Sequence, residues 1–365
     1  MSGLRFHQAP SPKPGRTDIW AERDGELVCS LEVMAAPVRL AGATLRTAGI
    51  ANVFTEEGHR RRGYASALMA HVHEVLVDAG YSTVALFGIP GFYGQFGYAT
   101  IGCDFALEVD TDVAAQAVGG HRLRLATAAD LPEVAEMYNA VNADLDGSVV
   151  RDPADWIGLR HGSTILGTTG LWIAEDAAGE SVGYLALRED AGGAEAIDGG
   201  FTESAVAPSL VAHAAAEAVK RQASTIRFEL HPEFGLGSHV RRMECRLESI
   251  RPLDAGYMLC LLDQDSVLGA IEPALRARAV AHGLRAPSRL RITTALGTTA
   301  VELGGPGPER TLTLPHERLT QLLFGYWSAA EVAEVERAGI AQEDVPWLTA
   351  LFPRGDAYCY EPDRY

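Results

Sequence analysis

The sequence predicts an α/β and α+β protein with two mixed-sheet domains of similar design and a smaller third domain. Its 365 residues exceed the size at which one hydrophobic core keeps growing, so two or three domains are expected. The order strand, glycine-containing turn, helix, strand occurs in the first hundred residues and again between residues 121 and 230. After Pro252 the pattern changes, which indicates a further α+β domain.

The first domain is predicted to contain a βαβ unit. A hairpin with the turn Asp24-Gly25 precedes it. An apolar strand, an amphipathic helix that Gly80 ends and a strand rich in β-forming residues then follow, over Leu45 to Thr55, Tyr64 to Val77 and Thr83 to Phe87. This order predicts a mixed sheet with a crossover helix.

The second domain is expected to start after the break at Gly119-Gly120. The stretch Thr127 to Asp130 resembles a capping box at a helix entry. The other predicted elements are strands over His121 to Ala126, Leu171 to Glu175, Ser181 to Arg188 and Thr225 to Leu230, with a helix over Ser209 to Arg221. The repeated order is consistent with an internal duplication, although the two copies share little identity.

The third domain is predicted from a strand, a long helix, a strand-rich stretch and two later helices. These elements cover Tyr257 to Leu262, Val267 to His282, Leu290 to Leu303, Pro315 to Phe324 and Ala329 to Ala338. The predicted domains are therefore residues 1–118, 119–252 and 253–365. The aromatic tail that ends at Tyr365 is expected to dock elsewhere on the molecule.

Composition excludes several classes of partner. Without a signal peptide or an apolar run of about 20 residues, we expect a cytoplasmic protein with no membrane partner. The formal net charge of −17 argues against nucleic acid and favours a cationic partner, although solubility alone would explain it equally well. The five cysteines have no C-x-x-C spacing, and His71 and His73 point to different sides of one helix, so we expect no metal.

The segment Arg60-Arg61-Arg62-Gly63 lies between an apolar strand and an amphipathic helix. A helix start presents unpaired backbone N–H groups and a positive dipole end, and Gly63 lets an anion approach closely. Three arginines could equally be a solvated surface run. The loop Gly91 to Tyr98, with three glycines besides four aromatic residues, favours the functional interpretation.

Together these motifs resemble the Gcn5-related N-acetyltransferases (GNAT), and most closely their Eis-like branch. The resemblance covers nearly the whole chain. It implies two tandem GNAT-like domains, a C-terminal domain like the sterol carrier proteins (SCP2-like), and acetyl-coenzyme A as the co-substrate. It also implies a homo-oligomer, because relatives commonly form hexamers.

The resemblance also implies roles for individual residues. The residues expected to hold acetyl-coenzyme A are Val53, Phe54 and Thr55 along the pantetheine and Arg60, Arg61, Arg62, Gly63, Tyr64, Ala65 and Ser66 around the pyrophosphate. Tyr93 matches the family's general acid. The terminal carboxylate of Tyr365, on a tail that is expected to fold back onto the first domain, matches its base. The alternatives are an aromatic residue in a structural turn for Tyr93 and simple docking of the tail for Tyr365.

Two parts of the sequence depart from the pattern. In the second copy the stretch Phe201 to Leu210 stands where the arginine cradle would open the helix, and it contains no arginine. We therefore expect no coenzyme there. The first domain would normally begin with a strand and one or two helices, and Met1 to Thr17, with three prolines, is too short for them. We therefore expect the elements that usually roof the acceptor site to be absent.

The sequence favours an N-acetyltransferase that acts on a small cationic amine, such as an aminoglycoside-like compound, a polyamine or a secondary-metabolite amine. Acetylation of protein lysines or N-termini is an open alternative. A non-catalytic protein that binds acetyl-coenzyme A or a lipid is another. Serine hydrolase, P-loop and HExxH zinc-protease motifs are absent from the sequence.

Overall fold

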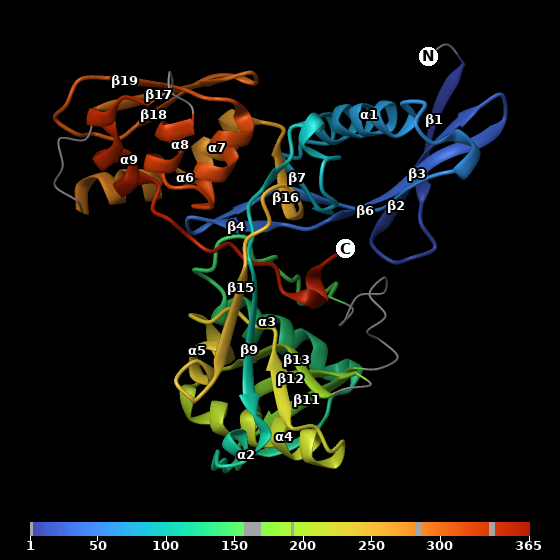
Figure 1. Cartoon of the computed structure of the whole chain (residues 1–365), viewed down its shortest axis with the longest axis vertical. Coiled ribbons are helices and arrows are strands. Elements are labelled where there is room, and N and C mark those ends of the chain that lie inside the picture. Colours follow the sequence, from blue (N-terminus) through green and yellow to red (C-terminus); the bar gives the residue numbers. More distant parts are fainter. Residues whose placement is uncertain (1–2, 157–168, 191–192, 282–286, 336–339) are drawn as a thin grey trace. The chain divides into compact units, whose positions relative to one another are not determined.

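In the computed structural model, residues 3–156, 169–190, 193–281, 287–335 and 340–365 are described (Figure 1). The chain folds into two compact units. The first comprises residues 1–102, 252–357 and Tyr365, and the second comprises residues 103–251 and 358–364. The polypeptide therefore passes from one unit to the other several times.

The first unit contains a seven-stranded mixed sheet. In spatial order its strands are β1 (Leu4–Pro10), β2 (Arg16–Arg23), β3 (Glu26–Ala35), β6 (Thr47–Thr55), β7 (Thr83–Gly88), β16 (Gly256–Leu261) and β8 (Ala99–Thr100). Only β6 and β7 pair in parallel; the other neighbours are antiparallel. The crossover between β6 and β7 is the helix α1 (Tyr64–Asp78), which confirms the predicted βαβ unit.

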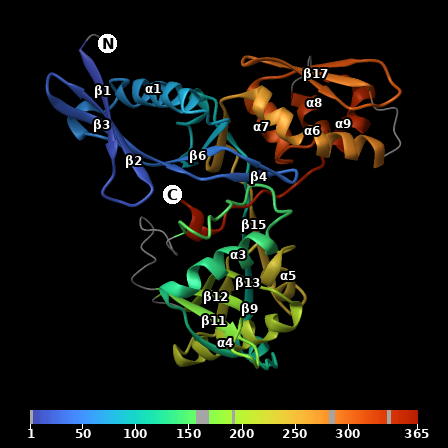
Figure 2. The same ribbon diagram turned by 180° about the vertical axis from the view of Figure 1, so that it is seen from behind.

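Helix α1 covers one face of this sheet (Figures 1 and 2). Leu68, Met69 and Val72 are fully buried, whereas the opposite face carries exposed charged residues. This amphipathic pattern is what drives a surface helix onto a sheet. Gly80, in the left-handed region at φ +79°, follows the end of the helix as predicted.

The second unit contains a seven-stranded sheet of the same design. In spatial order its strands are β10 (Arg122–Leu125), β11 (Thr169–Glu175), β12 (Ser181–Asp190), β13 (Gly193–Phe201), β14 (Thr225–Phe228), β9 (Asp104–Asp110) and β15 (Arg246–Ile250). Here β13 and β14 form the parallel pair, and α4 (Ala207–Lys220) is the crossover helix. The predicted capping box, Thr127 with Asp130, is present before α3 (Leu131–Val141). The two sheets match strand for strand, as a duplicated design requires.

The two sheets exchange one strand each, which the sequence analysis did not predict. The predicted domain boundaries place residues 104–110 in the first domain and Tyr257 to Leu262 in the third. The structure places β9 in the second sheet, between β14 and β15, and β16 in the first sheet, between β7 and β8. An alternating pattern identifies a strand but not its hydrogen-bonding neighbour, so sequence alone could not reveal the exchange.

The two domains differ most before their second strand. In the first, β1 and β2 form a hairpin, with only residues 11–15 between them. In the second, the longer segment between β10 and β11 includes α3. The N-terminal segment thus contributes a strand, which Pro10 ends, and the described residues before β2 contain no helix. The absence of elements that roof the acceptor site stays a prediction.

Residues 262–357 form the α+β part of the first unit. This part contains a three-stranded sheet and four named helices. The strands, in spatial order, are β18 (Gly297–Glu302), β17 (Arg289–Thr294) and β19 (Arg310–Thr313). The helices are α6 (Gln264–Ala281), α7 (His316–Leu323), α8 (Ala329–Val335) and α9 (Val345–Leu351). The predicted ends of two helices, at His282 and Ala338, lie outside the described residues. The likeness of this part to sterol carrier proteins stays a prediction.

Four of the five cysteines are buried. Cys29, Cys103, Cys260 and Cys359 are buried and form no disulfide, as predicted, whereas Cys245 is half-buried. Burial raises the pKa of Cys29 to about 11 and that of Cys260 to about 12, so both thiols are protonated at neutral pH. None of the helices in the described part of the chain has the length and hydropathy needed to cross a bilayer.

Candidate active site

The parallel strands β6 and β7 separate halfway along their length. Their pairing runs from Thr47 with Thr83 to Ile50 with Leu86, and within the described residues it goes no further. Beyond this point β6 continues to Thr55 along its other neighbour, β3. The backbone of β6 after Ile50 therefore has one edge that β7 does not cover.

A bulge accompanies this separation. The register between β3 and β6 shifts between Ser30 and Glu32, and Asn52 adopts a positive φ of 52°. A bulge increases local twist and turns the strand away from its neighbour. The predicted pantetheine-binding residues follow it: Phe54 is 46% exposed, and Val53 and Thr55 are half-buried. The extended part of a ligand could pair with this edge.

The predicted anion cradle lies at the start of α1. Gly63 is the N-cap residue at φ 79°, and Arg61 also has a positive φ, of 60°. No side chain caps the helix and its first turn holds no acidic residue. Arg60, Arg61 and Arg62 are exposed, and the Arg60 Nε–H donates to the carbonyl of Thr55 at 3.2 Å. This arrangement presents backbone N–H groups beside positive charge, as anion binding requires.

Of the remaining cradle residues, Ala65 and Ser66 are half-buried on the first turn of α1. Tyr64 is different, because it is only 3% exposed and belongs to the core. Its hydroxyl accepts a hydrogen bond from Arg23. The structure thus gives the Tyr64 side chain a packing role, while its backbone N–H belongs to the helix start.

The aromatic loop after β7 packs tightly. Phe92 lies edge-on to both Tyr93 and Phe96, with ring centroids 4.9 and 5.5 Å apart. The backbone N–H of Gly91 donates to the carboxylate of Asp254 at 2.9 Å, and the thiol of Cys260 lies 3.6 Å from the carbonyl of Phe96. The loop is therefore held by the segment that leads into and forms β16.

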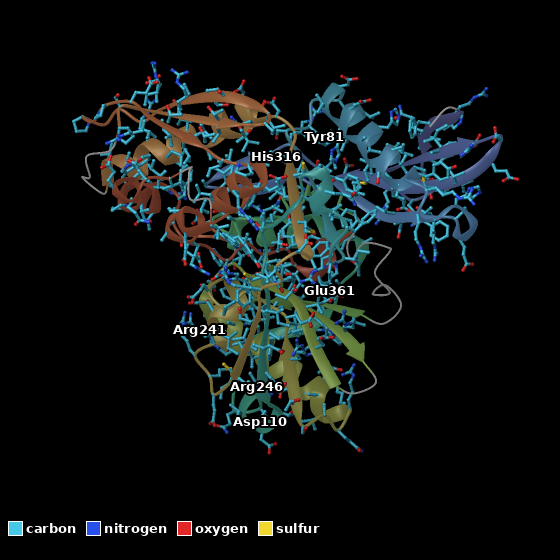
Figure 3. All side chains as sticks on the ribbon, turned by 45° about the horizontal axis from the view of Figure 1, so that its top comes forward. Tyr81, Asp110, Arg241, Arg246, His316 and Glu361 are labelled. Atoms are coloured by element: carbon cyan, nitrogen blue, oxygen red, sulfur yellow. The ribbon has the colours of Figure 1, made fainter. Side chains whose placement is uncertain are left out.

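Glycines in this loop allow its close contacts. A Cβ at Gly88 would lie 2.3 Å from Met258 Sδ and 3.1 Å from the Tyr93 ring. A Cβ at Gly97, where φ is +86°, would lie 2.2 Å from Nε2 of His316. His316, the first residue of α7, is marked in Figure 3. Larger residues at Gly88 and Gly97 would displace the side chains that surround Tyr93 and Tyr98.

Tyr93 and Tyr98 lie together at this end of the sheet. Their rings are edge-on with centroids 5.9 Å apart, and both are buried. Burial raises the pKa of Tyr93, so its phenol stays protonated and can serve as a proton donor. Burial, helped by the Cys260 thiol and the neighbouring phenols of Tyr93 and Tyr365, raises the pKa of Tyr98 well above its usual value.

The structure brings the last residue of the chain to the same region. The Tyr365 ring packs against β6, where a Cβ on Gly49 would be 3.0 Å from it, and lies edge-on to Phe87 at 5.9 Å between centroids. Gly49 is next to the last paired residue of β6, and Phe87 follows the last paired residue of β7. Tyr365 therefore lies where the two strands separate, in the same unit as Tyr93.

Sequence reasoning missed one pair of this region. His73 Nε2 and the Tyr98 hydroxyl are 3.0 Å apart. Burial, together with the nearby His316, lowers the pKa of His73 to about 4, so the ring is neutral at pH 7. The spacing of His71 and His73 could exclude a shared metal but could not reveal a partner 25 residues away. Among the described residues no group of three or more His, Cys, Asp and Glu side chains is placed to hold a metal.

We expect His73 to make stability depend on pH. The folded protein holds it neutral down to about pH 4, whereas the unfolded chain protonates it near 6.5, so stability falls as the pH drops from 6.5 to 4. A shift of this size corresponds to about 2–3 kcal/mol. The advantage of wild type over His73→Gln in urea unfolding should therefore shrink by about this amount between pH 7 and pH 4.

The control for this experiment is His71→Gln. His71 lies on the same helix and stacks on Phe6 with ring centroids 4.3 Å apart. This variant should keep the pH dependence of the wild type. If the curves of His73→Gln and wild type stay parallel over the same pH range, His73 is not a buried neutral group.

Comparison with known proteins agrees with this geometry. Residues 4–101 match the sequence model of the acetyltransferase (GNAT) domain family. The N-acetyltransferase Eis proteins of Mycobacterium tuberculosis and Mycobacterium bovis are 31% identical over 121 residues, which cover 31% of this chain and 30% of theirs. The matched segment thus spans less than a third of these curated relatives.

Solved structures extend the likeness in fold to nearly the whole chain. A GCN5-related N-acetyltransferase from Kribbella flavida has a TM-score of 0.71 at 20% identity over 95% of this chain and 87% of its own. A probable N-acyltransferase from Enterococcus faecalis has a TM-score of 0.73 at 15% identity, over 98% and 99%. Eis1 from Mycobacterium abscessus has a TM-score of 0.68 at 16% identity, over 95% and 90%. The resemblance to the GNAT superfamily and its Eis-like proteins is confirmed, by sequence over residues 4–101 and by fold over nearly the whole chain.

Proposed function

We propose that this protein is an N-acetyltransferase that moves the acetyl group of acetyl-coenzyme A to an amine. The separation of β6 from β7, with the arginine-flanked start of α1 beside it, is the observation that carries the proposal. An open strand edge suits the amide-containing pantetheine, and an uncapped helix start suits the pyrophosphate. Both features come from one βαβ unit, in the domain that matches the GNAT family.

In this proposal Val53, Phe54 and Thr55 lie along the pantetheine, and the cradle from Arg60 to Ser66 surrounds the pyrophosphate. The positive φ of Gly63 supports the assignment, because a glycine there allows the backbone to reach the phosphate closely. The exposed guanidinium groups of Arg61 and Arg62 add positive charge, which would attract the pyrophosphate over long range. No metal takes part in the proposed reaction.

The proposed chemistry is direct attack in a ternary complex. The acceptor ammonium first loses a proton to a carboxylate, which we assign to the C-terminus at Tyr365. The amine nitrogen then bonds to the thioester carbon, and the carbon–sulfur bond breaks. The leaving thiolate takes the proton of the Tyr93 phenol. The attacking nitrogen loses its second proton as the amide forms, and this proton restores the Tyr93 phenol. A buried phenol with a raised pKa supports this role, because it remains protonated until the thiolate forms.

The acceptor is proposed to be a small cationic amine. The net charge of −17 would attract such a molecule over long range. Acetylation of protein lysines or N-termini is tested by including lysine peptides among the acceptors.

Replacing Tyr93 with phenylalanine should separate catalysis from binding. The ring and its packing against Phe92 and Tyr98 remain, but the proton donor is lost. We expect kcat to fall by roughly 10²-fold or more with little change in the Kd for acetyl-coenzyme A. Thiol release, followed with aminoglycosides, polyamines and lysine peptides, measures the first quantity, and calorimetry measures the second.

The matched control is Tyr81→Phe, which changes a tyrosine beyond the end of α1 that Figure 3 labels. Its ring lies under the guanidinium of Arg46, 5.1 Å from the ring centroid. It should keep the wild-type rate. Full activity of Tyr93→Phe would remove Tyr93 from the reaction. If the wild type binds acetyl-coenzyme A but releases no thiol with any acceptor, the non-catalytic alternative is favoured.

Neutralising the cradle should weaken coenzyme binding rather than chemistry. The double change Arg61→Gln and Arg62→Gln removes two charges beside the start of α1, so the KM for acetyl-coenzyme A should rise roughly 10-fold or more. The kcat should change little. Steady-state kinetics at two salt concentrations measures both, and the wild type should lose more affinity with salt than the variant.

The control for net charge is Arg242→Gln, an exposed arginine of the second unit. It should leave the KM unchanged. An unaltered KM in the double variant would show that the pyrophosphate does not bind at this helix start.

A further inference from the structure

The segment that precedes Tyr365 is buried in the second unit. Tyr358, Cys359, Tyr360 and Asp363 are each no more than 2% exposed. The Tyr358 hydroxyl donates to the carbonyl of Glu229 at 2.8 Å, and its backbone N–H donates to that of Asp146 at 3.1 Å. Residues 358–364 are therefore held in the second unit by burial and by specific hydrogen bonds.

One buried arginine is central to this contact. The side chain of Arg151 is fully buried, and its Nε and Nη2 donate to the carboxylate of Asp363 at 3.0 and 2.9 Å. Its Nη2 also donates to Asp198 at 2.6 Å, and Asp198 accepts from the Tyr184 hydroxyl at 3.0 Å. A charge removed from water in this way needs such partners to remain ionised.

Further charged pairs hold the same segment. Arg188 pairs with Glu361, which Figure 3 labels, and its Nε donates to Glu195 at 2.8 Å. Arg364 Nη2 donates to Asp104 at 2.7 Å. The guanidinium of Arg151 also lies 3.5 Å from the centre of the Tyr138 ring. The bound segment thus meets charge of the opposite sign at three of its residues.

This binding place corresponds to the proposed coenzyme groove of the first domain. In the second sheet the parallel pairing of β13 with β14 ends at Ala196 with Phe228. Asp198 lies two residues beyond that end, and β13 carries a register shift at this point. The short helix η7 (Glu361–Asp363) contacts β13. The tail therefore lies where the second domain's two central strands separate.

We propose that the strand separation of the second domain is a binding site for the chain's own C-terminal tail, with Arg151 as the positioning residue. The domain that lacks an arginine cradle for a coenzyme thus keeps the groove and fills it with residues 358–364. Tyr365, whose terminal carboxylate is the proposed base, follows this segment directly in the chain. That the tail site restrains this carboxylate rests on the proposed function, whereas the binding of the tail does not.

Digestion with a carboxypeptidase tests the tail site independently of acetyl transfer. In the full chain, Asp363→Ala removes the tail's partner for Arg151, so release of the C-terminal tyrosine, followed by mass spectrometry, should be at least 10-fold faster than in the wild type. The matched control is Asp130→Ala, which removes an Arg–Asp pair in the same unit, with Arg124, away from the tail. It should release tyrosine at the wild-type rate.

The isosteric variant Asp363→Asn keeps the proposal testable if Asp363→Ala fails to fold. It retains the shape and one acceptor, so faster release by a smaller factor is expected. Release at the wild-type rate from either variant, with an unchanged circular dichroism spectrum, would overturn the tail site.

The role in positioning is read from the pH profile of kcat/KM. In Asp363→Ala the value should fall roughly 10- to 100-fold, and it should keep rising with pH where the wild type levels off, because hydroxide replaces the misplaced base. Faster tyrosine release with an unchanged profile would show that the tail site exists but does not position a base. Absence of activity in the wild type would refute the proposed function and leave the tail result standing.

Discussion

The interrupted pairing of β6 and β7 is the constraint on which the candidate site depends. Two parallel strands in a continuous sheet leave no free backbone between them, so a ligand could reach neither edge. Here the pairing ends at Ile50 and Leu86, and the bulge at Asn52 turns the rest of β6 away. The helix that connects the strands begins close to the end of β6, and its uncapped N–H groups stand beside the open edge. One local irregularity thus creates both parts of the proposed coenzyme site.

The side chains around the point where β6 and β7 separate are closely packed. Gly49 makes room for the Tyr365 ring, and Gly88 makes room for Met258 and Tyr93. Edge-on aromatic contacts of the kind that Tyr93 makes with Phe92 and Tyr98 contribute about 0.5–1.5 kcal/mol each beyond the area that they bury. The proposed role of Tyr93 as a proton donor would benefit from such fixed placement, because a misplacement of about 1 Å can cost 10²-fold in rate.

The sequence predicted the local elements well because they depend on local signals. The hairpin at Asp24-Gly25, the amphipathic helix α1 and the capping box at Thr127 all follow from turn chemistry or periodicity over a few residues. The exchange of β9 and β16 was not predictable in this way, since strand pairing depends on partners far along the chain. The contact between His73 and Tyr98 and the burial of Arg151 with Asp198 and Asp363 were missed for the same reason. The position of Tyr365 beside Phe87 was open to prediction only through the resemblance to a known family.

The surroundings of Tyr93, the proposed acid, include residues that lie far beyond the first hundred. They belong to β16 and the segment that leads into it. Asp254 binds the backbone of Gly91, Met258 fills the space beside Gly88, and Cys260 contacts the carbonyl of Phe96. All three belong to the chain that returns after the second domain is complete. Such non-local pairing is costly in loop-closure entropy, because its partners lie far apart along the chain. The loop that carries Tyr93 therefore has contacts with chain that follows the second domain, and residues 358–364, which precede Tyr365, belong to the second unit. The proposed acid and the proposed base thus both adjoin parts of the chain outside the βαβ unit that would bind the coenzyme.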